Sequence, residues 1–151
     1  MYQIKKKYPH VKLVAFGFKK PSEWDEQIIF VENPSREVLV KLYAHINIFY
    51  VPSIYEGWGL PAMEAMAQKC CVIAGDSGVI KEIGRDKINC IILEDPRNKN
   101  EAINKLSELV CNPNLVSEIG EAARTSVSNM STTKSAKRFE EILMSLLKEY
   151  K

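Results

Sequence analysis

The sequence predicts an α/β fold, a doubly wound parallel sheet with helices on both faces. Short apolar runs rich in β-branched residues recur along the chain, and such near-continuous runs are typical of strands buried on both faces. Segments of helical period separate the runs and supply the crossovers that parallel strands require. Apolar residues make up 46% of the 151 residues and charged residues 26%, which is the balance of one globular domain with a solvated surface.

The expected strands are the apolar runs at residues 11–16, 28–31, 46–51, 71–74 and 90–93. The expected helices lie at residues 35–44, 61–68, 98–110 and 115–128. Ser35 is the expected N-cap of the first helix, and residues 112–114 are expected to end the third before the fourth begins. A lysine-rich helical turn at residues 4–8 leads into the first run. A helix at that place normally follows an earlier strand, so we expect the first strand of the sheet to precede Met1.

The last segment, residues 133–150, has the pattern of an amphipathic helix. Its apolar stripe consists of Phe139, Ile142, Leu143, Leu146 and Leu147. A stripe of this kind must be buried against another surface, and we expect part of that surface to lie outside this chain.

Charge and hydropathy exclude several classes of function. The 21 basic and 19 acidic residues give a net charge of +2, which does not favour nucleic acid or an anionic membrane as a partner. No apolar run approaches the roughly 18 residues of a membrane span, and the N-terminal segment lacks the apolar centre of a signal peptide. We therefore expect a cytoplasmic domain.

The cysteines are expected to be structural rather than metal-binding. They show no Cys-x-x-Cys spacing, and the two histidines lie far from them in sequence, so we expect no zinc site. The residues concerned are Cys70, Cys71, Cys90, Cys111, His10 and His45. Cys71 and Cys90 each open an apolar run, where a reduced thiol packs as a small core residue.

The most informative stretch, residues 51–67, reads VPSIYEGWGLPAMEAMA and runs from a strand through a loop into a helix. Gly57 and Gly59 allow backbone N–H groups to approach a ligand closely, and Pro61 suits the first turn of a helix. The free N–H groups and the positive end of the helix dipole form a site for phosphate at the carboxyl edge of a parallel sheet. A diphosphate would fit here.

Glu56 lies in this loop and Glu64 about one turn inside the helix, so both carboxylates can face one cleft. A carboxylate is a good acceptor for the vicinal hydroxyls of a ribose or a hexose, because it has two acceptor oxygens and no donor. Each residue also has an ordinary structural explanation, Glu56 as a solvated loop residue and Glu64 as a partner of the helix dipole.

Taken whole, the stretch resembles the Glu-x7-Glu signature of family 4 retaining GT-B glycosyltransferases (glycosyl transferases group 1). The resemblance continues through residues 72–74, 76–82, 89–93 and 102–109, and through 120–124. It covers roughly residues 11–151 and implies that residues 1–151 are the Rossmann-like, C-terminal, nucleotide-sugar-binding half of a GT-B fold. The acceptor domain and the first strand would then lie upstream, and the last helix would cross back towards the acceptor domain.

The resemblance also implies roles for particular residues. Glu56 would be the catalytic residue that contacts the donor sugar, and the loop amides of Gly57, Trp58, Gly59 and Leu60 would hold the sugar and the phosphates. Glu64 would bind the ribose. Ser77 and Gly78, within residues 76–82, would close the other side of the site.

Several residues depart from the family pattern. Glycine is usual at Lys69, Val79 and Cys90, and proline at Cys71; Val79 in particular could narrow the donor cleft. The basic pair that neutralises the diphosphate in the family follows the first strand, which we expect upstream. Lys19 and Lys20 follow another strand end and are candidate phosphate contacts, although solvated lysines are the ordinary interpretation.

The leading hypothesis is a retaining, metal-independent hexosyltransferase of polysaccharide biosynthesis that uses a nucleoside-diphosphate sugar as substrate and no cofactor. It would be held near the inner membrane, if at all, through the acceptor domain. One alternative is a sugar-nucleotide-binding or regulatory module whose transferase activity has lapsed, which the lost glycines favour. Another is a different GT-B enzyme, an epimerase or a phosphorylase.

Overall fold

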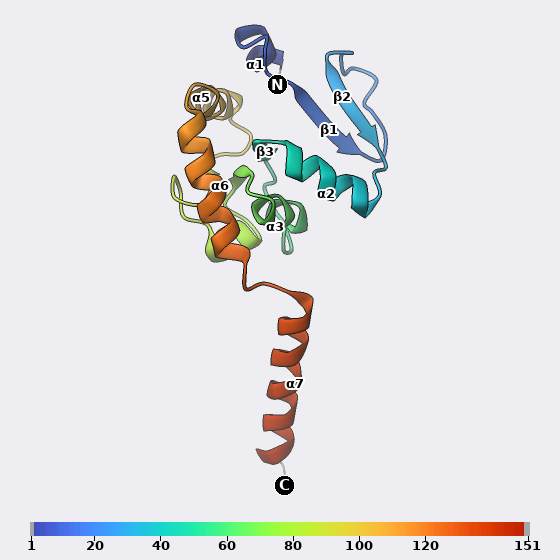
Figure 1. Cartoon of the computed structure of the whole chain (residues 1–151), viewed down its shortest axis with the longest axis vertical. Helices are drawn as coiled ribbons and strands as arrows, with labels where there is room; N and C mark the ends of the chain where they lie inside the picture. The colour runs from blue at the N-terminus through green and yellow to red at the C-terminus, as the bar shows by residue number, and fades with distance from the viewer. Residues whose placement is uncertain (1, 150–151) are drawn as a thin grey trace.

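The computed structural model describes residues 2–149, and Figure 1 shows a body of strands and helices from which the last helix extends. The strands are β1 (Leu13–Gly17), β2 (Ile28–Glu32), β3 (Ile48–Val51), β4 (Cys71–Gly75) and β5 (Ile91–Leu93). The helices are α1 (Tyr2–Lys7), α2 (Arg36–His45), α3 (Leu60–Ala67), α4 (Val79–Ile83), α5 (Lys99–Val110), α6 (Pro113–Val127) and α7 (Thr132–Glu149). Each predicted strand and helix is present, with ends shifted by about two residues at most.

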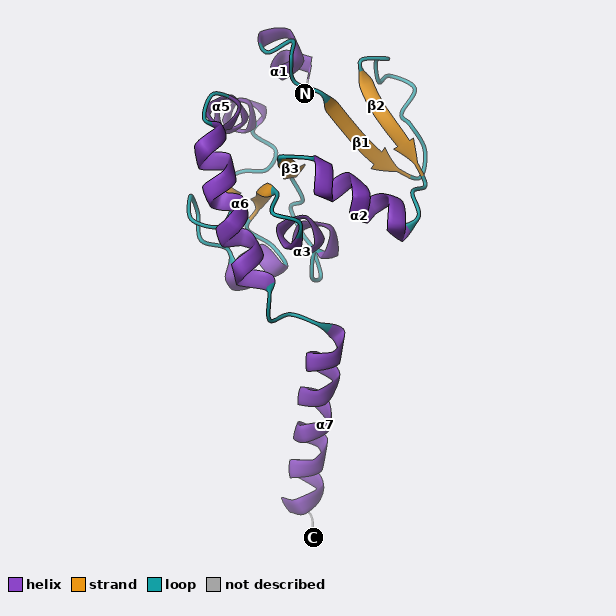
Figure 2. Ribbon diagram, in the orientation of Figure 1, coloured by secondary structure: helices purple, strands orange, loops and turns teal. Residues whose placement is uncertain are grey.

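All the strand pairings are parallel, as predicted, but the strands form two hydrogen-bonded sets. One set is β1–β2, and the other has the order β3–β4–β5. Figure 2 shows β1 and β2 side by side near α2. β1 and β3 are not hydrogen-bonded to each other, although Phe16 of β1 stacks on Phe49 of β3 with ring centroids 6.2 Å apart. The expected sheet is therefore interrupted between β1 and β3.

Side chains of β4 alternate between two core clusters, one on each face. Cys71 and Ile73 point to a cluster that includes residues of α1, α5 and the first half of α6. Val72 and Ala74 point to a cluster that includes residues of α2, α3 and α4 and the end of α6. Successive residues of a strand face opposite sides, and every residue of β4 is buried. Helices thus cover both faces, which confirms the doubly wound α/β prediction.

Helix starts follow the local sequence. The Val38 N–H donates to Ser35 Oγ at 3.4 Å, which confirms Ser35 as the N-cap of α2. Residues 112–114 were expected only to end α5, and this expectation was wrong. Asn112 caps α6, because its side chain accepts from the Leu115 N–H at 3.2 Å, and Pro113 begins that helix, where no N–H is needed.

Helix α4 is the element that the sequence pattern did not reveal. It spans five residues, which is too short for a helical period to be recognised. Residues 79–83 were expected only to close one side of the site. Their helical turn buries Val79 and Ile80 in the core between α3 and β4.

The amphipathic helix α7 extends away from the other elements in Figure 1. Its apolar residues are exposed, including Phe139 at 63% and Leu147 at 63%. They are not buried on this domain, so the expectation that the stripe packs on a surface outside the chain stays a prediction. Within residues 2–149, no helix is both long enough and apolar enough to cross a membrane.

Three thiols are fully buried in the core, at Cys70, Cys71 and Cys90. For Cys71 and Cys90 this confirms the structural interpretation. Burial raises the pKa of Cys70 to about 11, of Cys71 to about 12 and of Cys90 to about 11, from an ordinary value of 9.0. In the folded protein these thiols therefore stay protonated at a pH at which the thiols of the unfolded chain ionise.

Stability should consequently fall as the pH rises above about 9. Between the unfolded and the folded pKa the unfolded state binds fewer protons, so each buried thiol lowers the free energy of unfolding by about 1.4 kcal/mol per pH unit. The stabilisation is complete below pH 9 and lost as the pH passes the folded pKa. Urea unfolding at several pH values should show a shallower decline for Cys71→Ala, whereas the exposed Cys111→Ala should decline like the wild type. Equal slopes for all three proteins would contradict this account.

Candidate functional site

The loop between β3 and α3 lies at the carboxyl edge of the strands. Gly59 is the N-cap of α3 and has a φ of 81°, a left-handed conformation that favours glycine. Leu60 begins the helix and Pro61 follows within its first turn, as predicted from the missing N–H of proline. The sequence thus leads the chain from a buried strand directly into a helix N-terminus.

Four successive N–H groups around this N-terminus point to no protein acceptor. They belong to Gly57, Trp58, Gly59 and Leu60, and none donates a hydrogen bond to another group in residues 2–149. The positive end of the α3 dipole adds to their electrostatic effect. Such an arrangement is suited to the oxygens of a phosphate or a sugar.

A second loop, between β4 and α4, packs tightly on the first. The Val79 N–H donates to the Trp58 carbonyl at 2.6 Å. Gly78 has a φ of 54°, and a Cβ there would lie 2.6 Å from the Trp58 oxygen and 2.9 Å from Glu56 Cβ. Position 78 therefore requires glycine for both conformation and space, and the two predicted sides of the site do meet.

The two loops enclose a small hollow. Its lining includes the predicted residues Glu56, Gly59 and Ser77, and the full set is Val51, Ser53, Glu56, Gly59, Pro61, Ala62, Ala74, Gly75, Ser77, Val79 and Ile80. The free volume is about 10 Å³, which is room for about one water molecule. A sugar nucleotide would accordingly lie over this hollow rather than inside it.

Glu56 is half-buried, and its carboxylate has a partner that the sequence did not reveal. The Ser53 hydroxyl donates to Glu56 Oε1 at 2.7 Å. The signal was present in the Pro-Ser before the first glutamate, because a serine three residues before an acid in a loop can hydrogen-bond to it. Ser53 is thus a member of the site that sequence reasoning missed.

Glu64 lies on a different side of α3. It is not among the residues that line the hollow, and its Oε1 is 3.6 Å from the Arg36 guanidinium of α2. Burial, and next the negative charge of Glu64, raise the pKa of Tyr43 to about 12, so Glu64 also lies near that buried ring. The cleft shared by Glu56 and Glu64 is not formed by the hollow and stays a prediction.

The remaining predicted residues are more exposed. Trp58 is 44% exposed and its indole N–H donates to Met63 Sδ at 3.4 Å, while Leu60 is 55% exposed. Lys19 and Lys20 follow the carboxyl end of β1, and neither lines the hollow. Their contact with phosphate stays a prediction.

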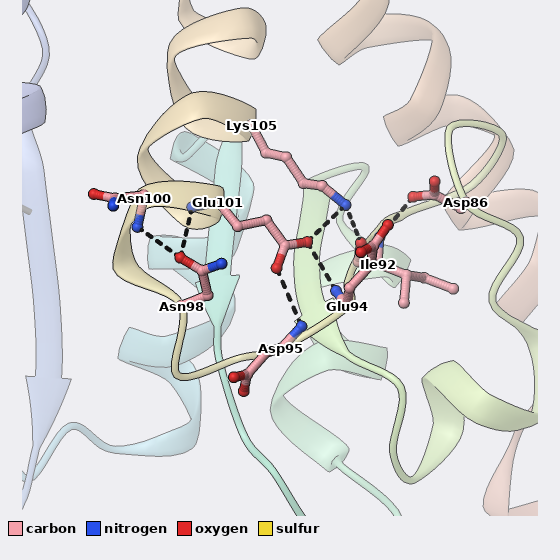
Figure 3. A network of polar contacts seen from close by, with 8 residues as sticks. All are labelled: Asp86, Ile92, Glu94, Asp95, Asn98, Asn100, Glu101 and Lys105. Carbon is pink, nitrogen blue, oxygen red and sulfur yellow. Dashed lines mark hydrogen bonds and ion pairs between the residues drawn. The ribbon is translucent and has the colours of Figure 1, made fainter.

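A polar network stiffens the same edge of the sheet after β5, as Figure 3 shows. The Glu101 carboxylate accepts from the N–H groups of Glu94 at 2.8 Å and Asp95 at 3.1 Å, and it pairs with Lys105 at 3.1 Å. These bonds hold the pKa of Glu101 below its usual value, the Glu94 N–H contributing most. The network fixes the loop that carries Pro96, and a Cβ on Gly75 would lie 2.6 Å from Pro96 Cγ. The floor of the hollow is therefore braced from the β5 side.

Parallel strands with helices on both faces, and a glycine-rich loop leading to a helix at their carboxyl edge, define a Rossmann-like domain of the GT-B type. The chain belongs to the family described as glycosyl transferases group 1, whose model matches residues 1–126. This confirms the family suggested by the Glu-x7-Glu stretch.

Similar proteins agree with this assignment. The C-terminal domain of the glycosyl transferase group 1 family protein LpcC from Francisella tularensis superposes with a TM-score of 0.74 at 29% identity, over 85% of this chain and 73% of that one. S. aureus TarM, in a complex with UDP and alpha-GlcNAc-glycerol, gives a TM-score of 0.72 at 26% identity, over 87% of this chain and 28% of that one.

Among curated relatives, the MMP alpha-(1->4)-mannosyltransferase of Mycolicibacterium hassiacum is 32% identical over 90 residues. The match covers 60% of this chain and 22% of that protein. The chain thus spans about a fifth of the length of this relative.

Proposed function

We propose that this chain is the donor-binding domain of a glycosyltransferase that transfers a hexosyl unit from a nucleoside-diphosphate sugar, with retention of configuration, to a glycan, lipid or other acceptor. The observation that carries the proposal is the row of four unpaired N–H groups at the N-terminus of α3, beside the Glu56 carboxylate. Membership of the family, a mannosyltransferase among the relatives and UDP in the TarM complex support it. The reaction would need no metal and no cofactor.

In this proposal the phosphates and the sugar lie over the hollow. The amides of residues 57–60 bind oxygens of the diphosphate and the sugar, and Glu56 contacts the sugar near its anomeric carbon. Ser77 and Gly78 lie opposite the loop and limit the space above it. Lys19 and Lys20, at the carboxyl end of β1, are the candidate cations for the diphosphate.

Glu64 would bind the ribose on the side of α3 that faces α2. The Arg36 guanidinium that it now meets is 85% exposed, and an exposed pair of this kind contributes roughly 0–1 kcal/mol. A ribose diol can therefore replace or join Arg36 at little cost, and it would satisfy both carboxylate oxygens.

The second candidate, a module that binds a sugar nucleotide without transferring the sugar, is favoured by Val79. This side chain is fully buried, lines the hollow and stands where the family pattern has glycine. Its γ-carbon lies 3.8 Å from the position of a Cβ on Gly59. Val79 thus fills space beside the loop, and turnover by the complete enzyme separates the two candidates.

We also propose that a further parallel strand lies between β1 and β3 in the complete enzyme. Both strands present an edge that is not paired to the other set, and β2 and β5 stand at the outer ends of an order β2–β1, gap, β3–β4–β5. Ile4 of α1 packs in the core opposite the α2 face, as expected for the crossover from such a strand to β1. Inserting one strand would give the order 3-2-1-4-5-6 of a dinucleotide-binding fold. The acceptor domain would precede it.

The division of roles between the two glutamates is testable in the complete enzyme. Glu64→Gln should weaken nucleoside diphosphate binding by about 1 to 3 kcal/mol, because an acceptor for two hydroxyls is replaced by a group that satisfies one. Glu56→Gln should lower turnover more than nucleotide affinity. Calorimetry with the bare nucleoside diphosphate measures the difference, with the exposed Glu108→Gln as control. Equal affinity losses at Glu56 and Glu64 would contradict the assignment.

The 151-residue chain alone should bind a sugar nucleotide weakly, in the high micromolar range or above, and transfer nothing. Holding the acceptor against the anomeric carbon can lower the barrier by roughly 7 to 11 kcal/mol, and we assign that task to the acceptor domain. NMR titration should shift the amide signals of Gly57, Gly59 and Glu64, while a parallel assay shows no sugar transfer. Measurable transfer would show that the catalytic machinery has been misplaced.

Amide hydrogen exchange tests the proposed strand. In this chain, amides of β1 and β3 that face the gap should exchange much faster than those of the fully paired β4. In a longer polypeptide that carries the residues before Met1, the same amides should become protected. Slow exchange at both edges in the present chain would mean that β1 and β3 pair directly in solution, which would refute the proposal.

A further inference from the structure

Ser53 connects the end of β3 to the carboxylate of the site. Its hydroxyl donates to Glu56 Oε1 at 2.7 Å, both side chains are half-buried, and both line the hollow. At this distance the bond is a strong one between a hydroxyl and a carboxylate. The other carboxylate oxygen, Oε2, receives no hydrogen bond from any donor in residues 2–149.

The backbone of Ser53 is fixed by the neighbouring strand. Gly75, at the end of β4, approaches so closely that a Cβ there would lie 2.4 Å from the Ser53 carbonyl oxygen. The Ser77 hydroxyl donates to the same oxygen at 3.5 Å. The hydroxyl of Ser53 is therefore directed from a rigid point on the β3–β4 edge, whereas Glu56 is carried by a loop.

The tether decides how Glu56 can meet a sugar. With Oε1 engaged by Ser53, Oε2 is the oxygen that offers unused acceptor capacity. The earlier expectation that Glu56 could accept from two vicinal hydroxyls at once, one on each oxygen, does not suit this arrangement. One sugar hydroxyl on Oε2 does suit it.

We infer that Ser53 is a positioning residue that reserves Oε1 of Glu56 and presents Oε2 to a single hydroxyl of the donor sugar. The inference rests on the proposed function and goes further, because it assigns Ser53 a role in recognition of the sugar and none in binding of the nucleotide. Its effect should thus appear in the extra affinity that the sugar contributes, measured as the ratio of the dissociation constants of the bare nucleotide and the sugar nucleotide.

The test uses the 151-residue chain and four probes, UDP with UDP-glucose and GDP with GDP-mannose, titrated by NMR. For the pair that binds, wild type should bind the sugar nucleotide more tightly than the bare nucleotide. Ser53→Ala should reduce this ratio by about threefold to tenfold and leave affinity for the bare nucleotide unchanged. Ser53→Thr, which keeps the hydroxyl, should restore the ratio. Ser128→Ala, which removes a hydroxyl that donates to the Thr125 carbonyl at 2.8 Å far along the chain, is the matched control.

Two results would overturn the inference. One is an unchanged ratio in Ser53→Ala. The other is an equal loss for bare and sugar nucleotide in both Ser53 variants, which would mean that the residue only supports the loop.

A measurement without ligand keeps this inference separate from the proposed function. Three-bond couplings of the Glu56 side chain should report one rotamer in wild type and in Ser53→Thr, and an average of rotamers in Ser53→Ala. If no probe binds to wild type, the proposed function falls together with the sugar contact, and the couplings then decide whether Ser53 orients Glu56. If nucleotides bind but neither couplings nor ratio change, the positioning role alone is refuted.

Discussion

The close approach of the β3–α3 loop to the β4–α4 loop is the constraint on which the site depends. The Trp58 carbonyl accepts the Val79 N–H, and the space between Gly78 and Trp58 is too small for a Cβ. Because this bond satisfies the Trp58 carbonyl, the N–H groups on the same loop are left pointing away from the protein. The backbone of two loops, rather than a set of charged side chains, therefore forms most of the site.

Both loops are held by strands whose side chains serve two cores at once. Alternate residues of β4 contribute to one cluster beside α3 and to another beside α5, so β4 cannot move without disturbing both faces. The polar network around Glu101 fixes the loop after β5 against Gly75. Ser53, Gly75 and Ser77 thus meet at a rigid edge, and the rigidity of that edge allows Ser53 to orient a carboxylate on the adjacent loop.

Two features of the chain point to surroundings beyond the domain. The edges of β1 and β3 are not paired with each other, and α7 displays its apolar stripe to solvent. Both arrangements leave groups that usually find partners in larger proteins, backbone N–H and carbonyl groups at the edges and large apolar side chains on the helix. They are consistent with the small share of the mannosyltransferase relative that this chain spans.

The sequence by itself determined the elements, the class of fold and the family. Strands buried on both faces leave continuous apolar runs, Ser35 and Pro61 mark helix starts through the backbone groups that they satisfy or lack, and the stretch around Glu56 is specific enough to identify the family. These signals are local, so a single chain is sufficient to read them.

Tertiary structure decided which of the predicted site residues meet. It placed Glu56 beside Ser53 and turned Glu64 towards Arg36, although seven residues of one segment separate the two acids. It also revealed the short helix α4 and the interruption between β1 and β3. Such features depend on the direction of a side chain from its helix and on contacts between loops far apart in sequence, and neither leaves a periodic pattern along the chain.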